Sequence, residues 1–221
     1  MKKMLILLLC LTLSGCATAS SQLCTVSINS LSNGESVVAK KCIILSGSKD
    51  VNTDDLQFKE YAMYVKRALE DKGYTVVDKD NEADIAVSLA YGISEPQQHS
   101  YENPGARMGN ALMMAGAGLQ GQNPYAAQMP AQIEYVTTYI RSISLSAYDA
   151  KLLRESKKAK QLWKTDIVSE GQSNDLRGVF PVMIGAAAKH IGENTGKIIN
   201  VNLTADNKDV LKIKGIEEVK R

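Results

Sequence analysis

Histidine and cysteine are scarce in this sequence of 221 residues, which contains two histidines and four cysteines. A structural zinc site needs four such ligands at close spacing, and these residues are too few and too far apart to supply them. Signatures of catalysis are missing as well, since no Gly-x-Ser-x-Gly, phosphate-binding loop or His-Glu-x-x-His motif occurs. The sequence therefore indicates no cofactor, no metal site and no catalytic residue.

An excess of charge of one sign is also missing. The 26 Lys and Arg residues nearly balance the 24 Asp and Glu residues. Without Lys2 and Lys3, which lie in the N-terminal segment 1–15, 24 basic residues remain against the same 24 acidic residues. Nucleic-acid-binding proteins carry a clear basic excess, and those that bind single strands interleave it with aromatic residues. We therefore expect no nucleic-acid partner.

Long hydrophobic runs are absent, and the short one at the N-terminus is informative. Met4–Leu11 is apolar and follows Lys2 and Lys3, but it is too short to cross a bilayer as a helix. A basic segment, a short apolar core and small residues before a cleavage point are typical of a secretory signal peptide. Residues 1–15 are therefore excluded from the expected fold.

The end of this segment, Leu13-Ser14-Gly15-Cys16, resembles the lipobox of bacterial lipoproteins at all four positions. In that family the thiol and the new N-terminal amine of the cysteine are acylated after cleavage. The resemblance implies that Cys16 is lipidated and that residues 16–23 form a tether to the lipid bilayer, where two or more acyl chains anchor stably. Ala17 follows in place of Asp, which in Gram-negative lipoproteins implies the outer membrane, here at its periplasmic face.

Cys24 and Cys42 remain as a pair in an oxidising compartment. Alternating residues after Cys24, the turn signal at residues 32–34 and a strand-like run over 38–45 predict a β-hairpin. A turn centred on Asn33 places Cys24 directly opposite Cys42, close enough for a disulfide. We predict this disulfide, with two free thiols or a turn centred elsewhere as the alternative.

The remaining pattern predicts one α+β domain over residues 24–204. Residues 54–72 and 175–192 each show one apolar helical stripe, the first capped by Thr53, so both helices should pack on one face of a single antiparallel-rich mixed sheet. The basic stretch 151–160 is predicted to be a solvated loop, with contact to anionic headgroups or glycan as the alternative. Residues 205–221 are predicted to be a charged C-terminal tail.

Residues 104–132 form an insertion that differs from the rest of the chain. They hold four of the eight Met and three of the five Pro, several Gly and Ala, and Arg107 as the single charge. An insertion of this length without periodicity is either functional or disordered. It is interpreted as a mobile loop between two strands, or as an adaptable Met-rich contact surface for a partner.

The chain also resembles a group of bacterial lipoproteins known only as a domain of unknown function. The resemblance implies no reaction and no catalytic residue, because the matching stretches are core and turn positions. These stretches are Asp55-Leu56-Gln57-Phe58-Lys59-Glu60-Tyr61, Lys72-Gly73-Tyr74, Ala83-Asp84-Ile85, Tyr139-Ile140-Arg141-Ser142, Leu162-Trp163-Lys164-Thr165, and Ser169-Glu170-Gly171 through Phe180-Pro181.

The polar residues best placed for chemistry are His99, His190, Asp84 and Glu170. Neither histidine has an obvious partner, and each acid borders a strand, where it is expected to cap a turn. Paired-carboxylate chemistry would need the two acids within about 5–10 Å of each other. The sequence thus favours a non-enzymatic binding or assembly module of the cell envelope with an envelope protein as partner. The alternative is an envelope hydrolase or glycan-acting enzyme with an unrecognised site.

Overall fold

The computed structural model describes residues 23–34, 41–102 and 133–216. The predicted signal peptide, Cys16 with most of the predicted tether, and the insertion 104–132 lie outside the described residues. None of the helices in the described ranges is long and apolar enough to cross a membrane.

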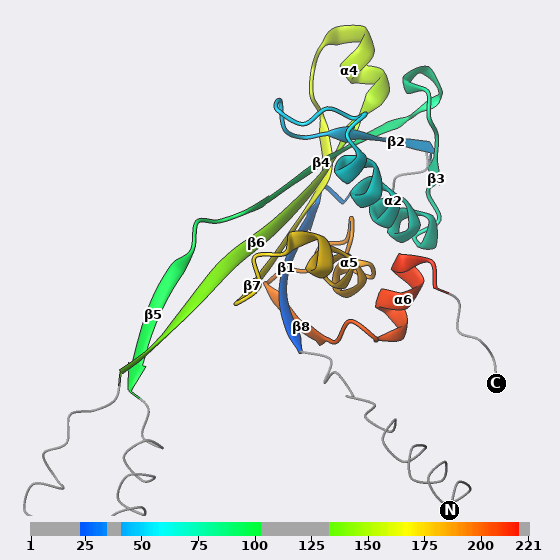
Figure 1. Ribbon diagram of the computed structural model, residues 1–221. Helices are drawn as coiled ribbons and strands as arrows, with labels where there is room; N and C mark the ends of the chain where they lie inside the picture. Colours follow the sequence, from blue (N-terminus) through cyan, green and yellow to red (C-terminus); the bar gives the residue numbers. More distant parts are fainter. Residues whose placement is uncertain (1–22, 35–40, 103–132, 217–221) are drawn as a thin grey trace, which may run out of the picture.

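The strands form a mixed sheet that is mostly antiparallel (Figure 1). Its order is β3-β2-β4-β6-β7-β1-β8, and β5 pairs with β6 outside this path. Within the described ranges, only the pairings of β2 with β3 and with β4 are parallel. The strands are β1 (Cys24–Ser32), β2 (Lys41–Ser46), β3 (Thr75–Val76), β4 (Ile85–Ile93), β5 (Gln97–Glu102), β6 (Ile133–Asp149), β7 (Gln161–Gly171) and β8 (Ile199–Leu203).

Three helices pack on one face of the sheet: α2 (Leu56–Asp71), α5 (Leu176–Ala187) and α6 (Lys208–Lys214) (Figure 1). Alternate strand residues meet them in one continuous apolar core, at whose centre Tyr61 stacks on Phe180 with ring centroids 3.9 Å apart. The short helix α4 (Ala150–Ser156) contacts the other face through Ala150. The predicted α+β class, with the two main helices on one face, is confirmed.

The helix ends follow from local capping. Asp55 caps α2, since its carboxylate accepts hydrogen bonds from the amides of Gln57 (2.8 Å) and Phe58 (3.0 Å). The predicted cap at Thr53 is therefore two residues too early. Asp175 caps α5 in the same way, and Pro181 lies inside this helix.

The predicted hairpin between Cys24 and Cys42 is wrong. Strand β1 pairs with β7 and β8, whereas β2 pairs with β3 and β4, so three strands separate β1 from β2 in the sheet. At about 4.8 Å per strand, Cys24 and Cys42 are far beyond disulfide reach. Both thiols are free in the structure, and that of Cys24 lies 3.2 Å from the hydroxyl of Ser169. The predicted register is wrong because it assumes that strands adjacent in sequence pair with each other.

Two segments that the sequence predicted as loop or tail are helical. Residues 150–156 form α4, capped by Asp149, in the stretch predicted as a basic loop. Residues 208–214 form α6, in which Val210 and Ile213 are buried against α5 and α2. The folded domain therefore extends past residue 204 and includes much of the predicted tail.

A two-stranded arm projects from one end of the sheet (Figure 1). It consists of β5 and the first part of β6, with Gln97 paired to Thr138 and Glu102 to Ile133. The same strand β6 continues into the sheet, where it pairs with β4 and β7. We call residues 97–102 and 133–138 the arm.

Candidate functional site

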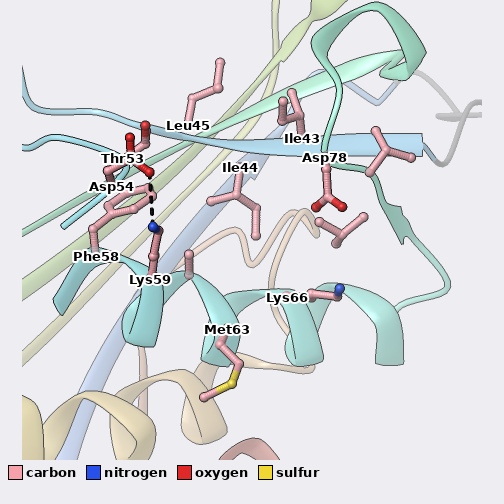
Figure 2. Close-up of a pocket in the computed structure, with 13 residues that line it drawn as sticks. Ile43, Ile44, Leu45, Thr53, Asp54, Phe58, Lys59, Met63, Lys66 and Asp78 are labelled. Atoms are coloured by element: carbon pink, nitrogen blue, oxygen red, sulfur yellow. Dashed lines mark hydrogen bonds and ion pairs between the residues drawn. The ribbon is translucent and has the colours of Figure 1, made fainter. Parts of the chain in front are cut away.

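A groove of about 650 Å³ lies between β2 and α2 (Figure 2). Strand β2 forms its upper wall, α2 its floor, and the ends of two connecting loops close it. The lining residues are Ile43, Ile44 and Leu45 of β2, Phe58, Lys59, Ala62, Met63 and Lys66 of α2, Thr53 and Asp54 before α2, and Val76, Val77 and Asp78 at the end of β3.

The wall formed by β2 is an open sheet edge over half its length. Strand β3 pairs with β2 only at Lys41 and Cys42, and the last bond on this side runs from the Val77 amide to the Cys42 carbonyl at 2.8 Å. Backbone groups of a strand alternate between its two sides. The amide and carbonyl of Ile44 therefore point to the same side as the Cys42 carbonyl, into the groove, and within the described residues they have no strand beside them.

Side chains make the groove apolar inside and charged at the rim. The side chain of Ile44 points from β2 toward α2, while Ile43 and Leu45 point to the opposite side of the strand (Figure 2). Phe58 is buried on the helix, and Met63 is 41% exposed. At the rim, Lys59 forms an ion pair with Asp54 at 3.1 Å, and Lys66 contacts Glu70 at 3.9 Å. Such a groove offers main-chain hydrogen bonds along one wall and apolar contact along the other.

The residues that the sequence singled out for chemistry do not meet in this groove. His99 lies on β5, where its Nε2 is 3.1 Å from the Thr138 hydroxyl and 3.7 Å from the Glu170 carboxylate, with the side chains of His99 and Glu170 each more than half exposed. His190 follows α5, and its amide bonds to the Ala187 carbonyl. The structure thus gives His99 two neighbours that the sequence did not reveal.

Asp84 and Glu170 lie at opposite ends of the sheet. Asp84 directly precedes β4, whose first residue Ile85 pairs with Asp149 of β6. Glu170 pairs with Ile140, which lies on the same strand β6. Nine residues of extended chain separate these rows by about 30 Å, so the two carboxylates cannot act as a pair. In the described residues, no group of three His, Cys, Asp or Glu side chains is arranged to hold a metal ion.

One face of strand β4 carries small residues and is partly exposed. Ala86 is buried against α4, but Ser88, Ala90 and Gly92 are only half-buried. Helices α2, α5 and α6 all contact the opposite, bulky face of this strand. Helix cover of the small-residue face is therefore limited to the end of the strand near Ala86.

The sequence did not predict the groove, because it predicted a hairpin in which β2 pairs with β1. In that pairing β1 would lie beside β2. One signal was present: Cys42–Leu45 is a continuous apolar run, which is typical of a strand buried in a parallel sheet. Together with the helix over 54–72 and the short strand after Gly73, it indicates a strand–helix–strand unit. Such a unit places α2 over the sheet beside β2.

Comparisons with known proteins add little. No protein-family model matches the sequence, and no curated protein matches it. A crystal structure of a PDZ domain protein from Parabacteroides distasonis aligns with a TM-score of 0.41 and 11% identity, covering 83% of this chain. The chain spans 39% of the length of that protein. This likeness is too weak to carry an argument about function, and the resemblance to a lipoprotein family stays a prediction.

Proposed function

We propose that this protein is a lipid-anchored, non-enzymatic binding module of the bacterial envelope that captures an extended polypeptide segment at the open edge of β2. The observation that carries the proposal is the unpaired backbone of Ile44 beside an apolar groove, within the part of the chain that the structure describes. An exposed sheet edge presents alternating donors and acceptors, and another extended strand satisfies them in register. The captured segment would continue the line of β3.

The groove also sets what the segment should look like. Alternate side chains of an added strand point to opposite faces, so one set would face α2. On that face they would meet Ile44, Phe58 and Ala62, which favours apolar residues at every second position. The rim carries Asp54 and Asp78 as well as Lys59 and Lys66, so no single charge sign is selected. Main-chain pairing gives affinity here, and the apolar pockets give specificity.

The lipid anchor and the cellular location are part of the same proposal. Acylated Cys16 would hold the module at the periplasmic face of the outer membrane, with an envelope protein supplying the segment. No reaction is part of the proposal, since the titratable side chains lining the groove are two lysines and two aspartates at its rim. A hydrolase or glycan-acting enzyme is not favoured by any specific observation.

The test uses a phage-displayed library of random twelve-residue peptides against the purified protein. We expect enrichment of extended peptides with alternating apolar residues. Binding should slow hydrogen exchange of the Ile44 and Ser46 amides, because a paired amide exchanges only when the added strand dissociates. Ala62→Phe fills the groove and should weaken binding at least tenfold.

Leu56→Phe is the matched control, because Leu56 lies on the same helix, is 83% exposed and does not line the groove. This variant should bind like the wild type. Enriched peptides that protect amides elsewhere, or that bind Ala62→Phe normally, would contradict the groove. The anchor is tested separately: the mature chain should begin at acylated Cys16 by mass spectrometry, and Cys16→Ser should leave an unprocessed precursor.

A further inference from the structure

The arm leaves the sheet as a ribbon of two strands. Pairing between β6 and β7 ends at Tyr139 and Gly171, and beyond this row residues 133–138 pair with β5 alone among the described residues. A two-stranded ribbon in water is marginally stable unless something else packs on it. The described part of the domain meets the arm at its base, where Glu170 accepts a hydrogen bond from the Thr138 hydroxyl and lies 3.7 Å from His99. The arm beyond this point needs a contact from elsewhere.

Apolar side chains are exposed on both faces of the arm. Ile133 and Tyr135 lie on one face and are 54% and 65% exposed, whereas Tyr101 lies on the other face and is 47% exposed. The arm has no Lys or Arg, and its two carboxylates are those of Glu102 and Glu134, the latter accepting a hydrogen bond from the Tyr101 hydroxyl at 2.6 Å. A folded protein partner would cover one face of such a ribbon, whereas a fluid medium covers both.

The tether and the arm leave the domain at the same end. Val26 pairs with Ser169, which pairs with Arg141, so Cys24 at the start of β1 lies two residues closer to the arm, level with Tyr139. Figure 1 shows the start of β1 and the arm directed to the same side of the molecule. A tether that continues the line of β1 therefore places Cys16 on the side toward which the arm points.

The length of the tether is also sufficient to match the length of the arm. The eight residues from Cys16 to Cys24 span at most about 27 Å when fully extended. From Tyr139 to Ile133 the arm is six residues long, or about 20 Å. A lipid-anchored chain thus has just enough tether for the end of the arm to stand on the bilayer surface, and too little to lift the arm far away from it.

We propose that the arm rests in the headgroup region of the bilayer, with Tyr101, Ile133 and Tyr135 as its lipid contacts. Tyrosines are favoured at this level because the ring is apolar and the hydroxyl remains hydrated. Without basic residues on the arm, the contact does not depend on anionic lipid or on low salt. The inference rests on the proposed acylation of Cys16 and adds a second point of attachment to it.

The test places a reporter on the arm of the full lipidated protein. Trp163 is the only tryptophan in the chain and is 2% exposed, so it contributes a constant background. Tyr135→Trp and Leu31→Trp are compared after reconstitution into phosphatidylcholine vesicles with brominated acyl chains, which quench tryptophan on contact. Leu31 is the matched control because it is 54% exposed on β1 at the end of the sheet away from the arm.

We expect the tryptophan introduced by Tyr135→Trp to lose at least half of its emission in brominated vesicles and to keep this loss in 0.5 M NaCl or with added phosphatidylglycerol. The Leu31→Trp variant should be quenched no more than the wild type. Co-flotation of each variant with the vesicles reports the anchor independently.

Flotation without quenching of the Tyr135→Trp variant overturns this inference and leaves the anchor intact, whereas loss of flotation overturns both. A blue shift of the emission of the Tyr135→Trp variant without quenching shows that protein and not lipid covers the arm, and it also overturns the inference.

Discussion

At the scale of single residues, Cys42 shows how a polar group is held in the core. Its thiol is fully buried in β2 between the short strand β3 and β4. Burial, with a smaller contribution from the negative charge of Glu70, raises the pKa of the Cys42 thiol from 9.0 to about 11. The folded protein therefore keeps this thiol protonated at a pH where the unfolded chain releases the proton.

The sign of the resulting pH dependence follows from this difference in pKa. Between pH 9 and 11 the folded state binds more protons than the unfolded state, so the free energy of unfolding should fall as the pH rises. The full loss is about 2–3 kcal/mol for one group of this kind. Urea unfolding at several pH values measures it. Cys42→Ala should show a shallower slope over the same range, and an equal slope in both proteins would contradict the assignment.

At the scale of elements, α6 is a helix in a stretch that the sequence predicted to be a charged tail. The sequence after residue 204 is dominated by charged residues, yet Val210 and Ile213 are spaced to face the core together. A Cβ at Gly185 of α5 would lie 3.1 Å from the Cγ2 of Val210, so the two helices approach closely at this point. Two core-facing residues in a seven-residue helix are too weak a pattern to predict without knowing the surface that they meet.

Val210→Ala should lower the free energy of unfolding by about 1–3 kcal/mol, because it leaves a cavity against α5. Chemical denaturation with circular dichroism measures the change. Lys208→Ala is the control, since Lys208 is at the first position of the same helix, outside the core, and should change stability little. Equal effects of the two substitutions would mean that α6 does not belong to the core.

The other elements show where sequence reasoning succeeds. Helices α2 and α5 lie within the ranges 54–72 and 175–192 that the sequence predicted, because these helices are 16 and 12 residues long and each shows a clear apolar stripe. The pairing of strands was predicted least well. Strands β1 and β2 are neighbours in sequence but lie apart in the sheet, because β1 is inserted between β7 and β8. The groove depends on that pairing, so it could not be predicted either.

At the scale of the whole molecule, one apolar core joins the three packed helices to the sheet, without a covalent link between Cys24 and Cys42. We therefore expect a single unfolding transition in urea with the same midpoint in the presence and absence of dithiothreitol. A disulfide closing this loop would add about 3 kcal/mol and raise the midpoint by about 1 M or more at typical m-values of about 1–3 kcal/mol/M. Thiol titration of the unreduced, unfolded protein should find both cysteines reactive.

The position of the groove along the sheet sets its distance from the end of the arm. Ile44 is level with Val87 and hence with Ala147, eight residues along β6 from Tyr139, where the arm begins. This distance is about 27 Å, and the arm adds about 20 Å. For a chain anchored as proposed, with the arm on the bilayer surface, a partner segment rising from the same bilayer would need about 14 extended residues to reach the groove. Shorter juxtamembrane segments would not reach the groove. Capture would therefore select partners first by the length of free chain that they hold above the membrane, and only then by their side chains.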